Sequence, residues 1–207
     1  MKSFKGILCL VLTLVIGFTL TANETQAASK KVSLKLSNGG TYYGEVKNGK
    51  PHGKGTATWG DYKTYSGEWK NGQRSGNGKF TEYLMSDAFE EHGGYYNLGK
   101  EVYTGTWKND KKSGQGVRTY YYEWRSEDPH REVSKGIFNN GAFIKGYHYT
   151  DNYSFSGEGV AYTYVDGDHT KELKPDKQFY QLKKIADELY VSLPTKIKEK
   201  FNDGILN

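Results

Sequence analysis

Apolar and polar residues alternate with a period of two along most of the chain, and glycines interrupt the alternation at recurring places. In residues 65–80, YSGEWKNGQRSGNGKF, two alternating segments flank the pair Asn71-Gly72. Alternation of this kind predicts β-strands. An Asn-Gly pair between two such segments predicts a tight turn, because both central residues of a type I′ turn need a positive φ. These residues are therefore expected to form one antiparallel hairpin.

The hairpin pattern recurs along the sequence. Further turns are predicted at Asn48-Gly49, Asn109-Asp110 and Asn140-Gly141. The clear units span residues 42–59, 65–80 and 103–120, and a degenerate unit spans 134–167. Recurrence of one short unit is typical of repeat architectures, in which each unit packs mainly on its neighbours. We therefore expect a repeat array over residues 28–172.

The repeat glycines predict how each hairpin pairs. Folding the second unit about its turn places Tyr65 opposite Gly78 and Gly67 opposite Gly76. The same operation gives the pairs of the first and third units, which are Tyr42 with Gly55, Gly44 with Gly53, Tyr103 with Gly116, and Gly105 with Gly114. An aromatic ring that covers a cross-strand glycine recovers part of the stability that glycine costs in a sheet. The glycines expected to have this structural role are Gly44, Gly53, Gly55, Gly67, Gly76, Gly78, Gly105, Gly114 and Gly116.

Successive hairpins are expected to pair edge to edge. The predicted fold is mainly β, an elongated, twisted, single-layer antiparallel sheet of repeated β-hairpins. In residues 173–207 the period changes to that of a helix, with apolar positions at Phe179, Leu182, Ile185, Ala186, Leu189 and Leu193. A second short helix is predicted from Pro194 to the stop at Gly204. We expect a C-terminal α-helical cap that covers the open sheet edge or packs into the concave face, with a partner-binding or membrane-surface helix as the alternative.

Two insertions interrupt the period. Residues 81–102 are expected to form either a short helix that ends at Gly93-Gly94 or a longer hairpin loop. Residues 121–133 are expected to begin as an aromatic strand and to turn at Asp128-Pro129. Insertions in repeat arrays often carry function, but neutral elaboration is the interpretation preferred here.

The unit Y-x-G-E-W-K-N-G-x-x-x-G-x-G resembles the MORN repeat (membrane occupation and recognition nexus). The match covers residues 65–78 closely, and residues 42–55 nearly as well, where Val46 replaces the tryptophan. In the third unit Thr106 replaces the acidic residue and Asp110 replaces the turn glycine. The resemblance implies a non-catalytic repeat module, associated in that family with protein–protein contacts and with phospholipid binding.

The N-terminus resembles a secretory signal peptide. Two lysines precede the apolar run 6–22, and small residues follow it, so that cleavage is expected after Ala27, with Ala28 as a neighbouring choice. The rival interpretation is an uncleaved membrane anchor. Cleavage removes Lys2, Lys5 and Glu24 and lowers the net charge from +5 to +4, and it removes Cys9, the one cysteine. We therefore expect an exported protein without disulfides, extracellular or associated with the cell envelope and of bacterial type.

The sequence contains no motif that indicates an enzyme, a metal site or a cofactor site. The five histidines are scattered, and the lysines are interspersed with acids, which argues against a nucleic-acid partner. An unknown protein partner is therefore the main expectation, with anionic phospholipid headgroups or cell-wall glycan as the alternative. The candidate ligand face is Tyr42, Trp59, Tyr65, Trp69, Arg74, Tyr103 and Trp107. The competing interpretation is that these rings are the core and fill the groove beneath the C-terminal helix.

Overall fold

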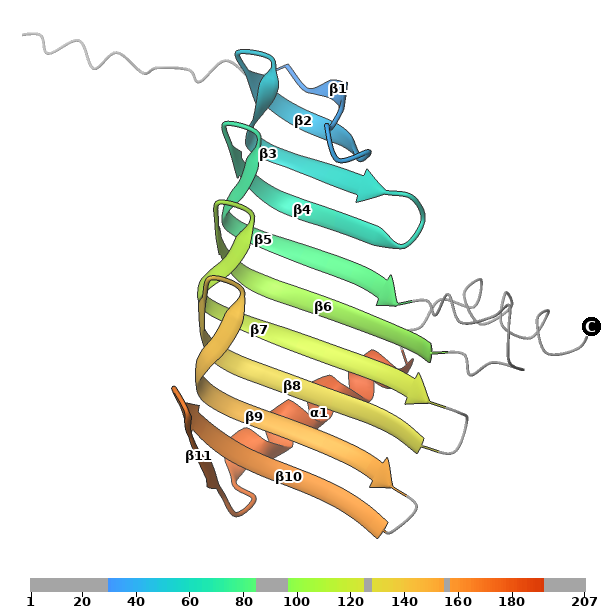
Figure 1. The fold of residues 1–207 in the computed structure, drawn as a ribbon, viewed down its shortest axis with the longest axis vertical. Coiled ribbons are helices and arrows are strands. Elements are labelled where there is room, and N and C mark those ends of the chain that lie inside the picture. The colour runs from blue at the N-terminus through green and yellow to red at the C-terminus, as the bar shows by residue number, and fades with distance from the viewer. Residues whose placement is uncertain (1–29, 85–96, 125–127, 155–156, 192–207) are drawn as a thin grey trace, which may run out of the picture.

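The computed structural model describes residues 30–84, 97–124, 128–154 and 157–191, which form one antiparallel sheet and one helix (Figure 1). The strands are β1 (Val32–Lys35), β2 (Thr41–Lys47), β3 (Lys50–Trp59), β4 (Lys63–Lys70), β5 (Gln73–Leu84), β6 (Asn97–Lys108), β7 (Lys111–Trp124), β8 (Asp128–Asn139), β9 (Ala142–Ser154), β10 (Gly157–Asp166) and β11 (His169–Glu172). The helix is α1 (Lys177–Val191). The predicted signal peptide, the segment Gly93-Gly94, Leu193 and the second C-terminal helix lie outside the described residues.

Over the described ranges the strands follow one another in the sheet in chain order, from β1 at one edge to β11 at the other. Each pair of neighbours is antiparallel, and the strands stack along the long axis of the molecule (Figure 1). The predicted fold class is confirmed. Because every strand pairs only with its neighbours in the sequence, the array is stabilised by contacts between adjacent units.

The four predicted turns are all present, and their backbone explains the residues found there. Asn48 and Gly49 have φ of 52° and 69°, and Asn71 and Gly72 have 53° and 89°. The third turn, Asn109-Asp110, takes the same left-handed conformation without glycine, with φ of 50° and 66°. Asparagine and aspartate tolerate this region better than other residues with a side chain. The hairpin positions were therefore predictable from these pairs.

The predicted register is correct next to the turns and wrong beyond them. Trp69 faces Arg74, the pairing that folding about the Asn71-Gly72 turn gives, but Gly67 faces Gly78 instead of Gly76, and Tyr65 faces Phe80 instead of Gly78. The same shift occurs in the first and third units, which pair Tyr42 with Ala57, Gly44 with Gly55, Tyr103 with Arg118 and Gly105 with Gly116. A β-bulge in each hairpin causes the shift.

The bulge is built around the first glycine of each G-x-G motif. Gly53, Gly76 and Gly114 have φ of 68°, 63° and 67°, which a residue with a side chain adopts only with strain. In the second unit, the Glu68 carboxylate fills the space beside Gly76 and accepts a hydrogen bond from the Asn77 amide at 3.0 Å. These three glycines therefore bend the strand and do not lie beneath rings, which corrects the role expected for them.

Of the remaining repeat glycines, Gly55, Gly78 and Gly116 lie beneath rings, whereas a methyl group on any of the other three would meet the backbone of the opposite strand first. A methyl group at Gly78 would fall 2.6 Å from both Cε2 and Cζ of Tyr65, and the equivalent group at Gly55 would collide with Tyr42. Gly116 stands in the same relation to Tyr103. The expectation that each ring covers a strand without a side chain is confirmed at these positions.

The two faces of the sheet differ. We call the face that carries Tyr42, Tyr65 and Tyr103 the repeat face. Residues directly opposite one another share a face, so the pairing of Tyr103 with Arg118 and of Arg118 with Ser134 places Ser134 on the repeat face as well. Val133, the neighbour of Ser134, points to the opposite face, which we call the helix face.

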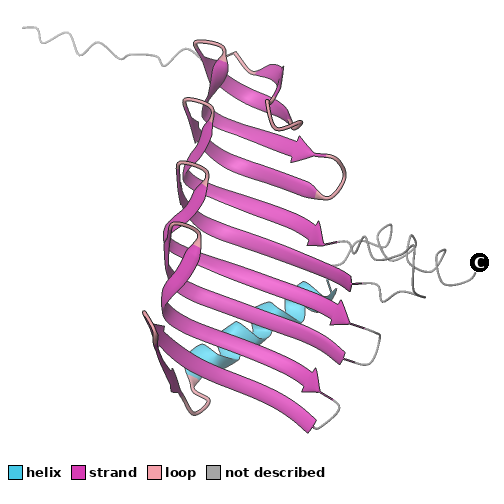
Figure 2. Ribbon diagram, viewed as in Figure 1, coloured by secondary structure: helices cyan, strands magenta, loops and turns pink. Residues whose placement is uncertain are grey.

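Helix α1 packs on the helix face, across β7, β8 and β9 (Figure 2). Its apolar stripe is as predicted, since Phe179, Leu182 and Ala186 are buried against Val133, Tyr149 and Tyr162, with Ile185 partly buried beside them. The Asp176 side chain caps its first turn by accepting a hydrogen bond from the Phe179 amide at 2.9 Å. The helix therefore packs on a face of the sheet and covers neither a sheet edge nor the rings of the repeats, so the expectations that it covers the open edge or the repeat rings are wrong.

The parts of the two insertions that the structure describes lengthen the strands, and the short helix or longer loop expected within 81–102 falls on residues outside the described ranges. Residues 81–84 and 99–102 continue the ladder between β5 and β6. Asp128 and Pro129 pair with Trp124 and Glu123 at the start of β8, so the turn expected at these two residues is wrong. Among the described residues, no helix is long and apolar enough to cross a membrane.

Candidate functional site

Most of the predicted ligand face is buried. Tyr42, Tyr65 and Tyr103 have no exposed surface, and Trp69 and Trp107 are 4% exposed. A sugar or a headgroup stacks on a ring only where one ring face is open. Trp59, by contrast, is half-buried and lines a groove. Trp59 therefore packs against the cluster that these five rings form but is more exposed than they are.

The five buried rings form one continuous series with Phe138. Each tryptophan lies edge-on between two tyrosines: Trp69 is 5.2 Å from both Tyr42 and Tyr65, and Trp107 is 5.2 Å from Tyr65 and 5.3 Å from Tyr103, measured between ring centroids. Tyr103 then contacts Phe138 at 5.0 Å. Edge-to-face contacts at such distances are favourable beyond the area they bury. The series therefore couples each repeat to the next.

The polar atoms of these rings are paired inside the core. The Tyr65 hydroxyl donates to the Glu68 carbonyl at 2.9 Å, and Tyr42 and Tyr103 make the equivalent bonds to Glu45 and Thr106. Burial raises the pKa of Tyr42 and of Tyr103 to about 12 and raises that of Tyr65 as well. The tyrosines are therefore neutral structural groups at ordinary pH.

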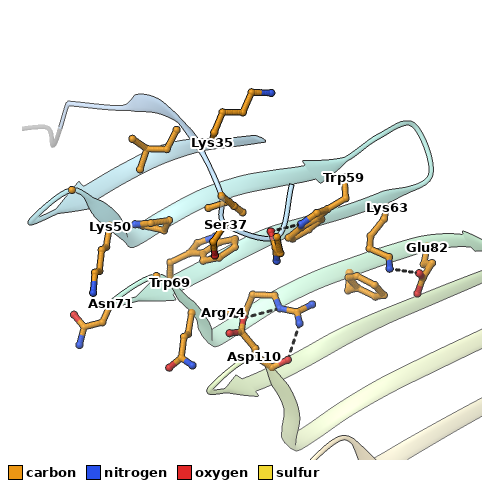
Figure 3. A pocket seen from close by; sticks show the side chains of 18 of the residues that line it. Lys35, Ser37, Lys50, Trp59, Lys63, Trp69, Asn71, Arg74, Glu82 and Asp110 are labelled. Atoms are coloured by element: carbon orange, nitrogen blue, oxygen red, sulfur yellow. Dashed lines mark hydrogen bonds and ion pairs between the residues drawn. The ribbon is translucent and has the colours of Figure 1, made fainter. Parts of the chain in front are cut away.

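Arg74 joins the tips of the second and third hairpins. Its Nε donates to Asp110 Oδ1 at 3.1 Å, and its Nη2 donates to the Asp110 carbonyl at 2.8 Å (Figure 3). The guanidinium also lies 4.4 Å from the centroid of the Trp107 ring, a cation–π contact. The charge of Arg74 is thus already engaged within the protein.

The groove that Trp59 lines has a volume of about 1130 Å³. It lies between the segment of residues 34–38 and the tips of the first two hairpins, on the repeat face (Figure 3). Trp59 Nε1 donates to Asn38 Oδ1 at 2.8 Å, which fixes the ring. Two ion pairs, Lys63–Glu82 at 2.5 Å and Arg74–Asp110, form part of its lining.

A row of glutamates follows the repeat face beside the tyrosines. We call Glu82, Glu101 and Glu132 the glutamate row. Glu82 and Glu101 are direct cross-strand partners, and Tyr120 separates Glu101 from Glu132. Like charges in opposite positions repel, and each carboxylate here is balanced by a cation, in the pairs Lys63–Glu82, Lys112–Glu101 and Arg118–Glu132. The carboxylate side chains are 18–26% exposed, so the row is partly accessible.

The fourth hairpin replaces the repeat tyrosine with a polar group that the sequence did not single out. Counting from Gly136 as the repeat glycine, Ser134 takes the position of Tyr103. Its hydroxyl lies 3.0 Å from His148 Nδ1, and burial lowers the pKa of His148. His130 Nε2 lies 2.6 Å from Glu132, and this hydrogen bond is the main cause of a lowered Glu132 pKa. In the sequence, this change is marked by the absence of a tyrosine two residues before Gly136.

These polar groups do not form a nucleophilic site. Ser134 is 1% exposed, so no substrate reaches its hydroxyl, and Glu132 contacts His130 and Arg118 instead of His148. Among the described residues, no group of three histidine, cysteine, aspartate or glutamate side chains is placed to hold a metal ion. These groups form a polar network in the fourth hairpin, at the end of the aromatic series.

The comparisons agree with the repeat geometry. A family model described as MORN repeat matches residues 42–64, 65–81 and 103–121. No curated protein matches the chain in a sequence comparison. The matched residues contain the three tyrosines, the paired glycines and the two tryptophans of the buried series. The chain therefore contains three MORN repeats, which lie between residues 42 and 121.

Proposed function

We propose that the chain is a non-catalytic module that is exported and binds a partner protein at the cell envelope, with the sheet acting as a scaffold. MORN repeats are generally associated with binding and scaffold roles, which supports the proposal. Export is inferred from the charged, apolar and small-residue segments of residues 1–27.

The observation that carries the proposal is the glutamate row beside the buried rings. Burial of the rings makes the repeat face stiff, while the row presents partly exposed carboxylates and their cations across β4 to β8. Such a surface is complementary to a polar protein segment that carries charges of both signs. Acidic groups of that segment would pair with Lys63, Lys112 and Arg118, and its basic groups would pair with the glutamates of the row. A rigid surface also loses little conformational entropy on binding.

The test is capture of a partner by residues 28–207 from an envelope extract. The Glu82→Lys variant reverses one charge of the row at a partly exposed site, and Tyr43→Ala changes a residue that is 58% exposed on the helix face. We expect capture of a defined protein that is weakened by Glu82→Lys and kept by Tyr43→Ala. Loss in Tyr43→Ala with no change in Glu82→Lys would contradict the proposal. Circular dichroism checks that both variants fold.

A second candidate function is direct binding of anionic phospholipid headgroups or cell-wall glycan. The observation in its favour is the groove beside Trp59, together with exposed lysines at the hairpin tips, such as Lys50, Lys70 and Lys108. Co-sedimentation with anionic liposomes and with purified cell wall, at low and near-physiological salt, tests it. Binding through charge decreases steeply as salt screens it, and a protein that stays in the supernatant with both materials excludes this candidate.

A further inference from the structure

We propose that the groove beside Trp59 binds an oligosaccharide that carries negatively charged groups, carboxylate or phosphate. This inference rests on the second candidate function and gives it a site and a ligand class. Three features carry it: a fixed indole ring, exposed amide side chains, and lysines that form no ion pair with a carboxylate among the residues that the structure describes.

Trp59 is held as a flat platform. A methyl group at Gly40 would lie 2.5 Å from Nε1 and 2.8 Å from both adjacent ring carbons, Cδ1 and Cε2. These three distances are nearly equal, which places the methyl group over the face of the pyrrole ring. If the methyl group lay in the plane of the ring beside Nε1, both carbons would be farther from it. Gly40 therefore supports one face of the indole, and the hydrogen bond from Nε1 to Asn38 prevents rotation. Trp59, held in this way, lines the groove.

The hairpin tips place amides along the same groove. Asn71 and Gln73 are both exposed, and both line it. A side-chain amide both donates and accepts hydrogen bonds, as a sugar hydroxyl does. The backbone of Asn71, with its left-handed φ of 53°, forms the turn beside the groove. An aromatic platform with a few convergent polar groups is a common composition for a ligand site.

The charges of the lining favour an anion. The cations are Lys35, Lys50, Lys63 and Arg74, and the acids are Glu82 and Asp110. Both acids are already paired, with Lys63 and Arg74 respectively. Within the described part of the chain, no carboxylate forms an ion pair with Lys50, and Lys35 donates to the Thr41 hydroxyl. The groove therefore has a surplus of positive charge for a carboxylate or phosphate.

The surroundings of the groove do not favour a lipid. Membrane binding usually adds apolar side chains that enter the headgroup region. The large apolar side chains that are exposed in the described residues are Tyr43, Val160 and Tyr180, and none of the three lines the groove. A solvated, anionic sugar chain matches the exposed amides and lysines and the half-buried Trp59 of this lining better.

The test is an array of uronate-containing, sialylated and phosphorylated oligosaccharides, each with a neutral counterpart, probed with residues 28–207. The variants are Trp59→Ala, Lys50→Glu and the control Tyr43→Ala. We expect binding to acidic members, at least about tenfold weaker in Trp59→Ala because stacking is lost, and weaker in Lys50→Glu. Titration with the best ligand should change tryptophan fluorescence in the unaltered protein and not in Trp59→Ala.

Three outcomes would overturn the inference. They are equal binding to neutral and acidic glycans, binding that both groove variants leave unchanged, and binding to anionic liposomes without binding to any glycan. Lys50→Glu changes an exposed side chain, so it keeps the test valid if Trp59→Ala fails to fold. If no member of the array is bound, the proposed glycan site is wrong. The capture experiment tests the partner protein separately, so the failure of one proposal is distinguishable from the failure of the other.

Discussion

The indole of Trp69 meets the ring of Tyr42, from the preceding repeat, edge to face with centroids 5.2 Å apart. The Trp69 Nε1 also donates to the carbonyl of Gly55 in that repeat, at 3.2 Å. Trp107 makes the equivalent bond to the carbonyl of Gly78 at 3.3 Å. Each tryptophan therefore joins its own hairpin to the one before it, through ring packing and through one hydrogen bond.

Replacing Trp69 should separate these two contributions. Trp69→Ala removes a buried ring and should lower the free energy of unfolding by about 3–5 kcal/mol. Trp69→Phe keeps an aromatic ring and should lose less, because about 1 kcal/mol is attributed to the missing hydrogen bond. Urea denaturation measures both, with exposed Tyr43→Ala as the matched control. Equal losses in Trp69→Ala and Tyr43→Ala would show that the ring is not part of the core.

The glycines beneath the rings should be less tolerant than the glycines of the turns. Gly78→Ala places a methyl group against the Tyr65 ring and should destabilise by about 1–3 kcal/mol or more. Gly49→Ala meets no atom within 4 Å and should cost about 1 kcal/mol, from its left-handed φ of 69°. Thermal or urea unfolding of the two variants makes the comparison. The packing account fails if Gly49→Ala is the more damaging of the two.

Asp110 should stabilise the fold more than a glycine at the same position of the third turn would. Asp110→Gly relieves the left-handed backbone but removes two bonds to the carboxylate, from the Arg74 amide at 2.9 Å and from Arg74 Nε at 3.1 Å. Because the pair is partly exposed, we expect a net loss of about 1 kcal/mol. Asp110→Asn keeps one acceptor oxygen and should lose less. An Asp110→Gly variant at least as stable as the unaltered protein would refute this interpretation.

The buried tyrosines should make the fold sensitive to alkali. Their folded-state pKa is raised, to about 12 for Tyr42 and Tyr103, above the ordinary value of about 10. The unfolded chain therefore ionises first, so stability is complete below about pH 10 and is lost as pH rises towards about 12. Tyrosinate absorbance and circular dichroism should change together in this range. Titration of all tyrosines near pH 10 with the fold intact would contradict the prediction.

The sequence predicted the hairpins because the turns depend on local chemistry. An Asn-Gly pair between alternating segments specifies its backbone whatever surrounds it. The register was harder to predict, because Gly76 and Gly78 both lack side chains and either could face Gly67. The bulge decides between them, and in the second unit it is accompanied by a hydrogen bond from the Asn77 amide to the Glu68 carboxylate across the hairpin. That contact is visible only once the strands are paired.

The position of α1 and the groove could not be read from local patterns. The helical period of Phe179, Leu182 and Ala186 shows which side of the helix is buried, but not which face of the sheet receives it. The support of Trp59 by Gly40 and Asn38 joins residues about twenty positions apart through a loop without a repeat pattern. Both features depend on long-range packing.

Site-specific photo-crosslinking tests the central claim, that the repeat face is the binding surface, most directly. A photoreactive amino acid placed at Glu82 on the repeat face, and in a separate variant at exposed Tyr43 on the helix face, would be activated in intact cells. The account predicts a defined adduct with a partner protein from position 82 and none from position 43. Adducts from position 43 alone, or from neither position, would contradict it.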